Sequence, residues 1–240
     1  ALAIPLLSPS PVHAALTSHA PIFIQFNSGF TKPDPVNGGG SGTENDPYII
    51  ENWDIVTSSD TGIEIWHTNA YFVIRNCYVH DGGHDGIYLY NVTNGVVDNN
   101  IMENNYDGIY LYYSDNNTLN NNIVENNYEY GILIDDFSDN NLILNNTAKN
   151  NPGDGIRLHG SDNNTVTGNT VENNDCGIFV SSSDNNHISG NIVKNNYYNG
   201  GFELSGADNN LISGNIVENN YIGIFPVSYT HLTLPTNREV

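Results

Sequence analysis

The chain has 240 residues, and its 27 acidic against 6 basic side chains give a formal net charge of −21 at pH 7. Nucleic-acid binding takes most of its affinity from Lys and Arg on phosphates, so this composition excludes a nucleic-acid partner and favours cations or neutral polar ligands. The 2 cysteines are too few for a disulfide framework or a thiolate metal site, and no apolar run has the length of a membrane span.

The first residues, ALAIPLLSPSPVHA (1–14), are interpreted as the remnant of a secretory signal peptide. Val12 and Ala14 fit the small-residue cleavage pattern, so the mature protein is expected to begin near Ala15. A disordered apolar arm is the alternative interpretation. Residues 15–47 are expected to form a lead-in or cap, ahead of a repeat domain over residues 48–226.

The repeat domain is marked by glycines that recur every 22–24 residues, and a period of this size indicates a solenoid. The glycines are Gly62, Gly86, Gly108, Gly131, Gly155, Gly177, Gly201 and Gly223. Counting each glycine as the first position, the second and fourth positions are apolar, as in Ile63 and Ile65, which is the alternation of a β-strand.

Two further apolar columns follow in each repeat. One consists of Val73, Val97, Leu119, Ile143, Val166, Ile188 and Ile212, and the other of Tyr78, Met102, Val124, Ala148, Val171, Val193 and Val217. Three short strands per repeat, separated by turn residues, predict an all-β, single-stranded, right-handed parallel β-helix of about eight coils.

Asparagine is expected to build the corners of this solenoid. One column holds Asn in every coil, namely Asn76, Asn100, Asn122, Asn146, Asn169, Asn191 and Asn215. Asn tolerates the left-handed conformation of a corner, and its amide can hydrogen-bond to the same amide in the next coil, so an asparagine ladder is predicted. The recurring SDNN segment is expected to form the other bend through side-chain hydrogen bonds to neighbouring backbone.

The phrase G-I-x-L followed by S-D-N-N-x-I-x-G-N-x-V-x-N-N resembles the repeat of NosD-like right-handed parallel β-helix proteins, also called the carbohydrate-binding and sugar-hydrolase (PbH1-type) repeat. The segment GTENDPYIIENWDI (Gly42–Ile55) resembles the opening of such domains in archaeal surface proteins. The resemblance covers residues 42–225 and implies an exported protein associated with polysaccharide. It also implies a copper-accessory role in some relatives, but 1 Met and 2 unpaired Cys provide few soft ligands for Cu(I).

Outward positions of the first strand carry an aromatic strip, which is the predicted substrate-binding surface. Its members are Trp66, Tyr88, Tyr90, Tyr110 and Tyr112. Exposed rings at coil spacing suit the apolar faces of sugars. The alternative is that the rings pack on each other as cross-strand pairs.

Asp135, Arg157 and His159 are the candidate catalytic residues, because they share the outward face of adjacent coils. A lyase or epimerase acting on a uronic acid polymer could use Arg157 to neutralise the substrate carboxylate and His159 to take the proton. Asp136 is expected to point elsewhere, since successive strand residues alternate. A surface ion pair is the alternative interpretation.

His80, His84, Asp85 and Asp107 are the candidate metal ligands, because the turn HDGGHD brings imidazole and carboxylate groups together. A glycine-rich turn with capping Asp is the alternative. The acidic column Asp115, Asp139, Asp162, Asp184 and Asp208 fits turn capping, and Ca²⁺ or another divalent cation between the coils is left open.

Residues 227–240 are interpreted as a non-native tail, because the Asn and Gly pattern breaks at Pro226 and VSYTHLTLPT resembles a translated transposase adapter. A genuine terminal cap is the alternative. The sequence therefore predicts an exported, cell-surface or envelope β-helix module whose partner is a polysaccharide or surface glycan. The alternatives are a lyase or epimerase on an acidic polymer, and a structural or adhesive envelope protein.

Overall fold

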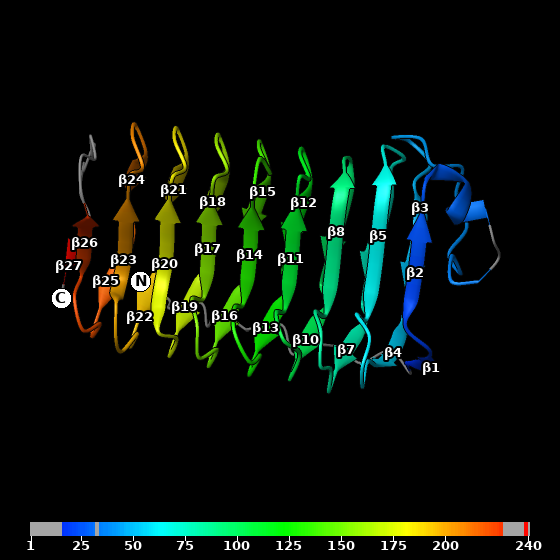
Figure 1. Cartoon of the computed structure of the whole chain (residues 1–240), viewed down its shortest axis with the longest axis horizontal. Coiled ribbons are helices and arrows are strands. Elements are labelled where there is room, and N and C mark those ends of the chain that lie inside the picture. Colours follow the sequence, from blue (N-terminus) through cyan, green and yellow to red (C-terminus); the bar gives the residue numbers. More distant parts are fainter. Residues whose placement is uncertain (1–15, 32–33, 228–237, 240) are drawn as a thin grey trace, which may run out of the picture.

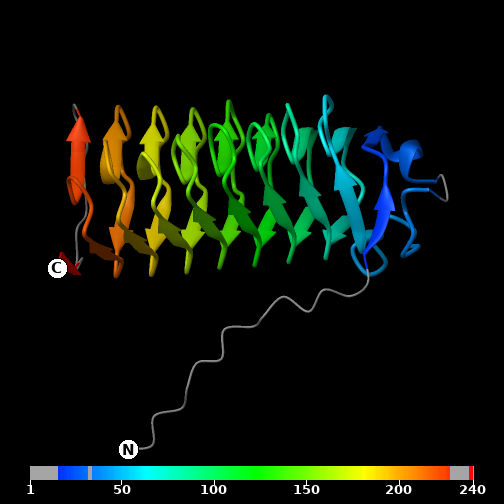
Figure 2. The same ribbon diagram turned by 90° about the horizontal axis from the view of Figure 1, so that it is seen from below.

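The computed structural model describes residues 16–31, 34–227 and 238–239 and confirms the parallel β-helix. Successive coils lie side by side along one axis (Figures 1 and 2), and every strand pairing is parallel. Residues 1–14 and most of the tail lie outside the described residues. The interpretations of these segments as a signal-peptide remnant and a non-native tail therefore stay predictions. In the predicted cap, β1 (Thr17–His19) pairs with β4 (Trp53–Val56), β2 (Ile22–Gln25) pairs with β5 (Ile63–Thr68), and the 3-10 helix η1 spans Asn27–Thr31.

Three sheets form the walls of the solenoid. The nine-stranded sheet, on the side facing the viewer in Figure 1, consists of β2 (Ile22–Gln25), β5 (Ile63–Thr68), β8 (Ile87–Val92), β11 (Ile109–Tyr112), β14 (Ile132–Asp135), β17 (Ile156–His159), β20 (Cys176–Ser181), β23 (Gly200–Ser205) and β26 (Ile224–Val227).

The other two sheets complete each coil. The eight-stranded sheet consists of β3 (Tyr48–Glu51), β6 (Phe72–Arg75), β9 (Gly95–Asp98), β12 (Thr118–Asn120), β15 (Leu142–Leu144), β18 (Thr165–Thr167), β21 (His187–Ser189) and β24 (Leu211–Ser213). The ten-stranded sheet consists of β1 (Thr17–His19), β4 (Trp53–Val56), β7 (Tyr78–His80), β10 (Ile101–Glu103), β13 (Ile123–Glu125), β16 (Thr147–Lys149), β19 (Thr170–Glu172), β22 (Ile192–Lys194), β25 (Ile216–Glu218) and β27 (Arg238–Glu239).

The predicted apolar columns fill the interior, with one error in the coil between Gly62 and Gly86. In that coil Val73 and Tyr78 point outward, and their neighbours Ile74 and Val79 are buried and pair with Val97 and Met102. The predicted columns were therefore one residue out of register in this coil. A one-residue shift on a strand exchanges its inward and outward faces.

The predicted asparagine ladder exists and is fully hydrogen-bonded. Asn122, for example, accepts from the backbone N–H of Asn100 at 3.0 Å, and its amide donates to the Val97 carbonyl at 2.8 Å and to Asn146 Oδ1 at 3.0 Å. Asn76 was wrongly placed in this column, because Cys77 occupies its position and donates its backbone N–H to Asn100. The left-handed conformation belongs to the preceding residue, Asn121 in this coil, with φ of 54°.

Two further asparagine ladders cap the other corners. One runs through Asn105, Asn127, Asn151, Asn174 and Asn196, and the other, formed by the last residue of SDNN, runs through Asn117, Asn141, Asn164, Asn186 and Asn210. The SDNN aspartates also act between coils, since each Oδ1 accepts the backbone N–H of the next Asp at 2.6–2.8 Å. The Asp and Asn side chains of SDNN thus bond mainly to neighbouring coils, whereas the sequence analysis expected them to bond to neighbouring backbone within the bend.

Replacing Asn146 by Ala should lower the free energy of unfolding by about 2–5 kcal/mol. The substitution leaves the Asn122 donors and the Leu119 carbonyl without their buried partner. Urea denaturation followed by circular dichroism measures the loss. The matched control is Asn145→Gly, because glycine holds the same left-handed position in the next coil at Gly168, and this variant should change stability by less than about 1 kcal/mol. Equal losses in both variants would contradict the role of the ladder.

Candidate functional site

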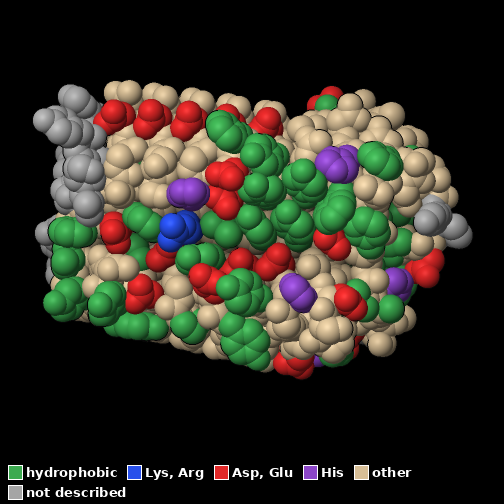
Figure 3. All heavy atoms as spheres, viewed as in Figure 1, with side chains coloured by type: hydrophobic (Ala, Val, Ile, Leu, Met, Phe, Trp, Pro, Cys, Tyr) green, Lys and Arg blue, Asp and Glu red, His purple; other side chains and the backbone are tan. Residues whose placement is uncertain are grey.

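The outer face of the nine-stranded sheet brings most of the predicted site residues into two parallel columns. Register pairing joins Trp66, Tyr90, Tyr112, Asp135 and His159 in one column across five coils. Tyr88, Tyr110, Leu133 and Arg157 form the adjacent column. Hydrophobic side chains gather over β5, β8 and β11 in the middle of this face, with acidic side chains beside them (Figure 3).

The aromatic rings of the strip pack on each other. Tyr88 and Tyr110 stack with centroids 4.9 Å apart, Tyr90 and Tyr112 stack at 5.7 Å, and Trp66 meets Tyr90 edge-on at 5.6 Å. Each of these side chains is only partly exposed. Because stacked rings cover one another's faces, the tyrosines offer mainly ring edges and hydroxyl groups to a ligand.

Four exposed aromatic residues widen the strip beyond the sequence prediction, namely Phe23, Phe26, Tyr113 and Phe137. Phe23 packs edge-on against Trp66, and Tyr113 stacks with Phe137. Tyr113 and Phe137 follow the ends of β11 and β14 and have φ of 51° and 56°. The sequence analysis missed them because strand alternation says nothing about residues in the left-handed conformation.

Asp135 and His159 form a hydrogen-bonded pair at the end of the aromatic columns. His159 Nδ1 lies 2.7 Å from Asp135 Oδ1, and the Tyr110 hydroxyl donates to Asp135 Oδ2 at 3.1 Å. The side chain of His159 is 44% exposed, so its ring remains open to solvent on this face. The pair therefore has a fixed carboxylate and an accessible imidazole.

The expectation that Asp136 points elsewhere is wrong. Its φ of 37° interrupts the strand alternation, and its Oδ1 lies 4.0 Å from His159 Nδ1. Asp135, Asp136 and His159 thus face one another on the same side of the sheet.

Arg157 is engaged in a neighbouring pocket and does not join the Asp135–His159 pair. Its guanidinium binds Asp154 at 3.0 Å and lies between the rings of Tyr130 and Phe179, at 5.2 and 4.6 Å from their centroids. The pocket has a volume of about 440 Å³, and Glu129, Asp175 and Glu203 also line it. Burial raises the pKa of Asp154 to about 6, and the Arg157 charge opposes this shift. Arg157 is thus already partly neutralised.

The four residues of the predicted metal site lie near β7 and the two following turns. His80 sits between Asp54 and Asp81, at 2.9 Å from each, and His84 is exposed. Burial raises the pKa of Asp85 to about 6 and that of Asp107 to about 7. Within the described part of the chain, the group of three close ligands is at Asp135, Asp136 and His159, and these four residues do not form another.

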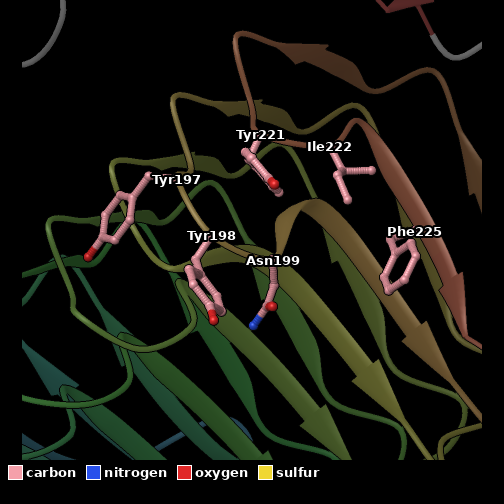
Figure 4. A pocket seen from close by; sticks show the side chains of 6 residues that line it. All are labelled: Tyr197, Tyr198, Asn199, Tyr221, Ile222 and Phe225. Atoms are coloured by element: carbon pink, nitrogen blue, oxygen red, sulfur yellow. The ribbon is translucent and has the colours of Figure 1, made fainter.

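A second aromatic pocket opens near the C-terminal end of the described coils (Figure 4). Its volume is about 420 Å³, and it is lined by Tyr197, Tyr198, Asn199, Tyr221, Ile222 and Phe225. Asn199 also lines the Arg157 pocket and donates to Asp175 Oδ2 at 3.1 Å, so the two pockets adjoin. The sequence analysis missed this pocket because most of its residues lie in loops outside the repeating strand pattern.

The comparisons with known proteins agree with the fold. A family model described as "Periplasmic copper-binding protein (NosD)" matches residues 27–222. Among curated proteins, no match was found. Structurally, the chain is similar to the periplasmic alginate epimerase AlgG, with 23% identity and a TM-score of 0.69 over 77% of this chain and 47% of that one.

Two other solved structures share the fold. The A-module of the mannuronan C-5 epimerase AlgE4 from Azotobacter vinelandii has 16% identity and a TM-score of 0.64 over 80% of this chain and 63% of that one. The catalytic domain of a GH87 alpha-1,3-glucanase in complex with nigerose has 15% identity and a TM-score of 0.53 over 97% and 57%. The chain spans less than two thirds of each of these three structures, and their low identity establishes the fold alone.

Replacing Asp107 by Asn should weaken the pH dependence of stability. Because the folded pKa of Asp107 is about 7 and the unfolded value is about 3.9, the folded state binds the proton more tightly, and the free energy of unfolding falls as pH rises from about 4 to about 7. Asn cannot bind this proton, and its side-chain oxygen can still accept the Tyr130 backbone N–H. Urea midpoints at pH 5 and pH 8 should differ less in Asp107→Asn than in the parent. The control Asp60→Asn, at an exposed position, should show the same pH dependence as the parent. If the urea midpoint of Asp107→Asn changes with pH as much as that of the parent, the raised pKa of Asp107 is contradicted.

Proposed function

This chain belongs to the NosD family of right-handed parallel β-helix proteins, and on that basis we propose that it acts outside the cytoplasm as a module that binds polysaccharide. The binding surface is the outer face of the nine-stranded sheet. The observation that carries the proposal is the unbroken column Trp66, Tyr90, Tyr112, Asp135 and His159, in which partly exposed aromatic rings continue into polar groups.

The chemistry of this column suits a carbohydrate. Three coils of aromatic side chains span about 10 Å at the spacing of parallel strands. Their hydroxyl groups and ring edges can contact sugar hydroxyls and C–H groups, and the exposed Phe23 and Phe137 extend the apolar surface at either end. Alginate epimerases and a glucanase, which share the fold, act on polysaccharides, and this supports the same class of partner here.

Charge limits which polysaccharides can bind. The net charge of −21 repels a bare polyanion, so the preferred ligand is a neutral glycan or an acidic glycan whose charge is balanced by cations. The NosD family and AlgG are both described as periplasmic, and this supports a location of the present protein outside the cytoplasm. Within the described ranges, the structure contains no helix long and apolar enough to cross a membrane.

The sulfur groups of this chain do not fit a Cu(I) carrier. Cys77, Met102 and Cys176 are the only thiol and thioether side chains, and all three are buried. Burial raises the pKa of Cys77 to about 12, so its thiol does not ionise at neutral pH. The accessible donors on the nine-stranded sheet are oxygen and nitrogen atoms, which suit a divalent ion.

Replacing both Tyr90 and Tyr112 by Ala should reduce glycan retention in affinity electrophoresis about fivefold, which corresponds to about 1 kcal/mol of binding free energy. The gels contain a panel of neutral and acidic polysaccharides. Since the two rings stack on each other, thermal unfolding should also shift, but only modestly. The matched control is Tyr78→Ala, a partly exposed tyrosine on the ten-stranded sheet. Retention lost equally in the control, or absent from the parent with every polysaccharide, would contradict binding and favour a structural or adhesive role.

A lyase or epimerase is the second candidate function, and the Tyr110–Asp135–His159 hydrogen-bond chain favours it. Asp135 holds Nδ1 of His159, which leaves Nε2 as a base for a proton next to a uronate carboxylate. Arg157 is a poorer candidate for neutralising that carboxylate, because it is already bound to Asp154.

If the chain is a lyase, His159→Ala should abolish the rise in ultraviolet absorbance from the unsaturated product, since the base is lost. Proton exchange at the sugar carbon, followed by NMR in deuterated water, tests epimerisation in the same way. His187→Ala, on the exposed surface of the eight-stranded sheet, should retain the activity of the parent. Full activity in His159→Ala, or no reaction by the parent on any uronate polymer, would eliminate this candidate.

A further inference from the structure

Asp135, Asp136 and His159 form a compact group of three potential metal ligands on the nine-stranded sheet. One ligand atom from each residue lies within 4.8 Å of the other two, and no other such group occurs in residues 16–31, 34–227 and 238–239. All three side chains are partly exposed. A metal ion can therefore reach the space between these side chains from solvent.

We propose that this group binds a divalent transition-metal ion through His159 Nδ1 and one oxygen from each aspartate. Ligand atoms bound to a common Zn²⁺ at about 2.1 Å lie about 3.0–3.5 Å apart. The Nδ1 distances to Asp135 Oδ1 and Asp136 Oδ1, 2.7 and 4.0 Å, bracket this separation. Small side-chain rotations are enough to bring the three atoms to equal distances from an ion.

The supporting hydrogen bonds orient Asp135 toward the same point. Its Oδ2 accepts the Tyr110 hydroxyl, and its Oδ1 accepts the backbone N–H of Asp136 at 3.0 Å. Such outer contacts fix metal-ligating carboxylates in protein sites. Asp135 is thus held in place before any ion arrives.

The repeat supplies this group only once. The position equivalent to Asp135 is occupied by Tyr112 in the preceding coil and by His159 in the following one. Between this position and the aligned serines Ser114, Ser138 and Ser161, the coil of Asp135 has two residues, Asp136 and Phe137, where its neighbours have only Tyr113 or Gly160. The left-handed backbone of Asp136 turns a carboxylate toward His159, and neither neighbouring coil provides a second carboxylate there. The group is therefore not a product of the general acidity of the chain.

The donor set indicates the class of ion. One imidazole nitrogen with two carboxylate oxygens suits Zn²⁺ or Cu²⁺, whereas Ca²⁺ takes six to eight oxygen ligands. Three protein ligands on an open surface leave coordination positions for water or for oxygen atoms of a bound sugar. This last role rests on the proposed function, since the ion would link an acidic glycan to an acidic protein face.

Equilibrium dialysis of the metal-free full chain against ZnCl₂, followed by elemental analysis, tests the site. The parent should bind one Zn²⁺, and Asp136→Asn and His159→Ala should each weaken binding about tenfold or more. Zn²⁺ should also raise the melting temperature of the parent and not of these variants, because the ion binds only the folded site. Circular dichroism of each variant verifies folding.

The matched controls are Asp60→Asn and His187→Ala, which change an exposed Asp and an exposed His away from the group. Both should bind Zn²⁺ like the parent. Unchanged binding in Asp136→Asn and His159→Ala, or no bound Zn²⁺ in the parent, would overturn the site. A parallel dialysis against CaCl₂ distinguishes this site from the acidic column of SDNN aspartates. A site in that column would prefer Ca²⁺ over Zn²⁺, and its affinity would not change in Asp136→Asn or His159→Ala.

Affinity electrophoresis with an acidic polysaccharide, with and without Zn²⁺, separates the site from the proposed function. Retention that requires Zn²⁺ and is lost in Asp136→Asn supports a bridging ion. Zn²⁺ binding without any effect on retention would leave the metal site standing and refute its role in glycan binding. Retention that does not respond to Zn²⁺ in a chain that binds no Zn²⁺ would refute the site and keep the proposed function.

Discussion

Hydrogen bonding of buried asparagine amides between coils is the interaction on which the rest of the structure depends. A solenoid of short strands must turn three times per coil, and each turn leaves backbone groups that would be costly to bury unpaired. Here the amide of one coil binds the backbone and the amide of the next, as Asn122 does with Asn100 and Asn146. The ladders therefore both stabilise the corners and fix the register in which coils stack.

That register determines how the outward-facing side chains are arranged on the surface. Because every strand of the nine-stranded sheet pairs with its neighbour at equivalent positions, outward residues of successive coils form straight columns. An aromatic column then leads directly to Asp135 and His159. A row of acidic side chains runs along the upper edge of this surface in Figure 3, and the proposed metal-ligating residues lie where the columns change from aromatic to polar.

Periodicity made the fold predictable, and departures from periodicity account for what the sequence did not reveal. Glycines and paired asparagines specified the coils, but in the coil containing Cys77 the second corner Asn is missing, and the alignment slipped by one residue there. The placement of candidate site residues in one outward column could be predicted where they follow strand alternation, as for Tyr90, Asp135 and His159. Asp136 and Phe137 were not predictable from alternation, because their left-handed backbone takes them out of that pattern. Asp154, which binds Arg157, lies three residues earlier in the chain, in the turn before β17, where strand alternation gives no side-chain direction.

The central claim is that a ligand contacts the outer face of the nine-stranded sheet, and hydroxyl-radical footprinting of the parent protein tests it most directly. Side-chain oxidation would be measured by mass spectrometry with and without each polysaccharide of a neutral and acidic panel. We expect at least one polysaccharide to lower oxidation of Tyr90, Tyr112 and His159 while leaving Tyr78, on the ten-stranded sheet, unchanged. Protection centred on Tyr78, or no protection with any polysaccharide, would contradict the account.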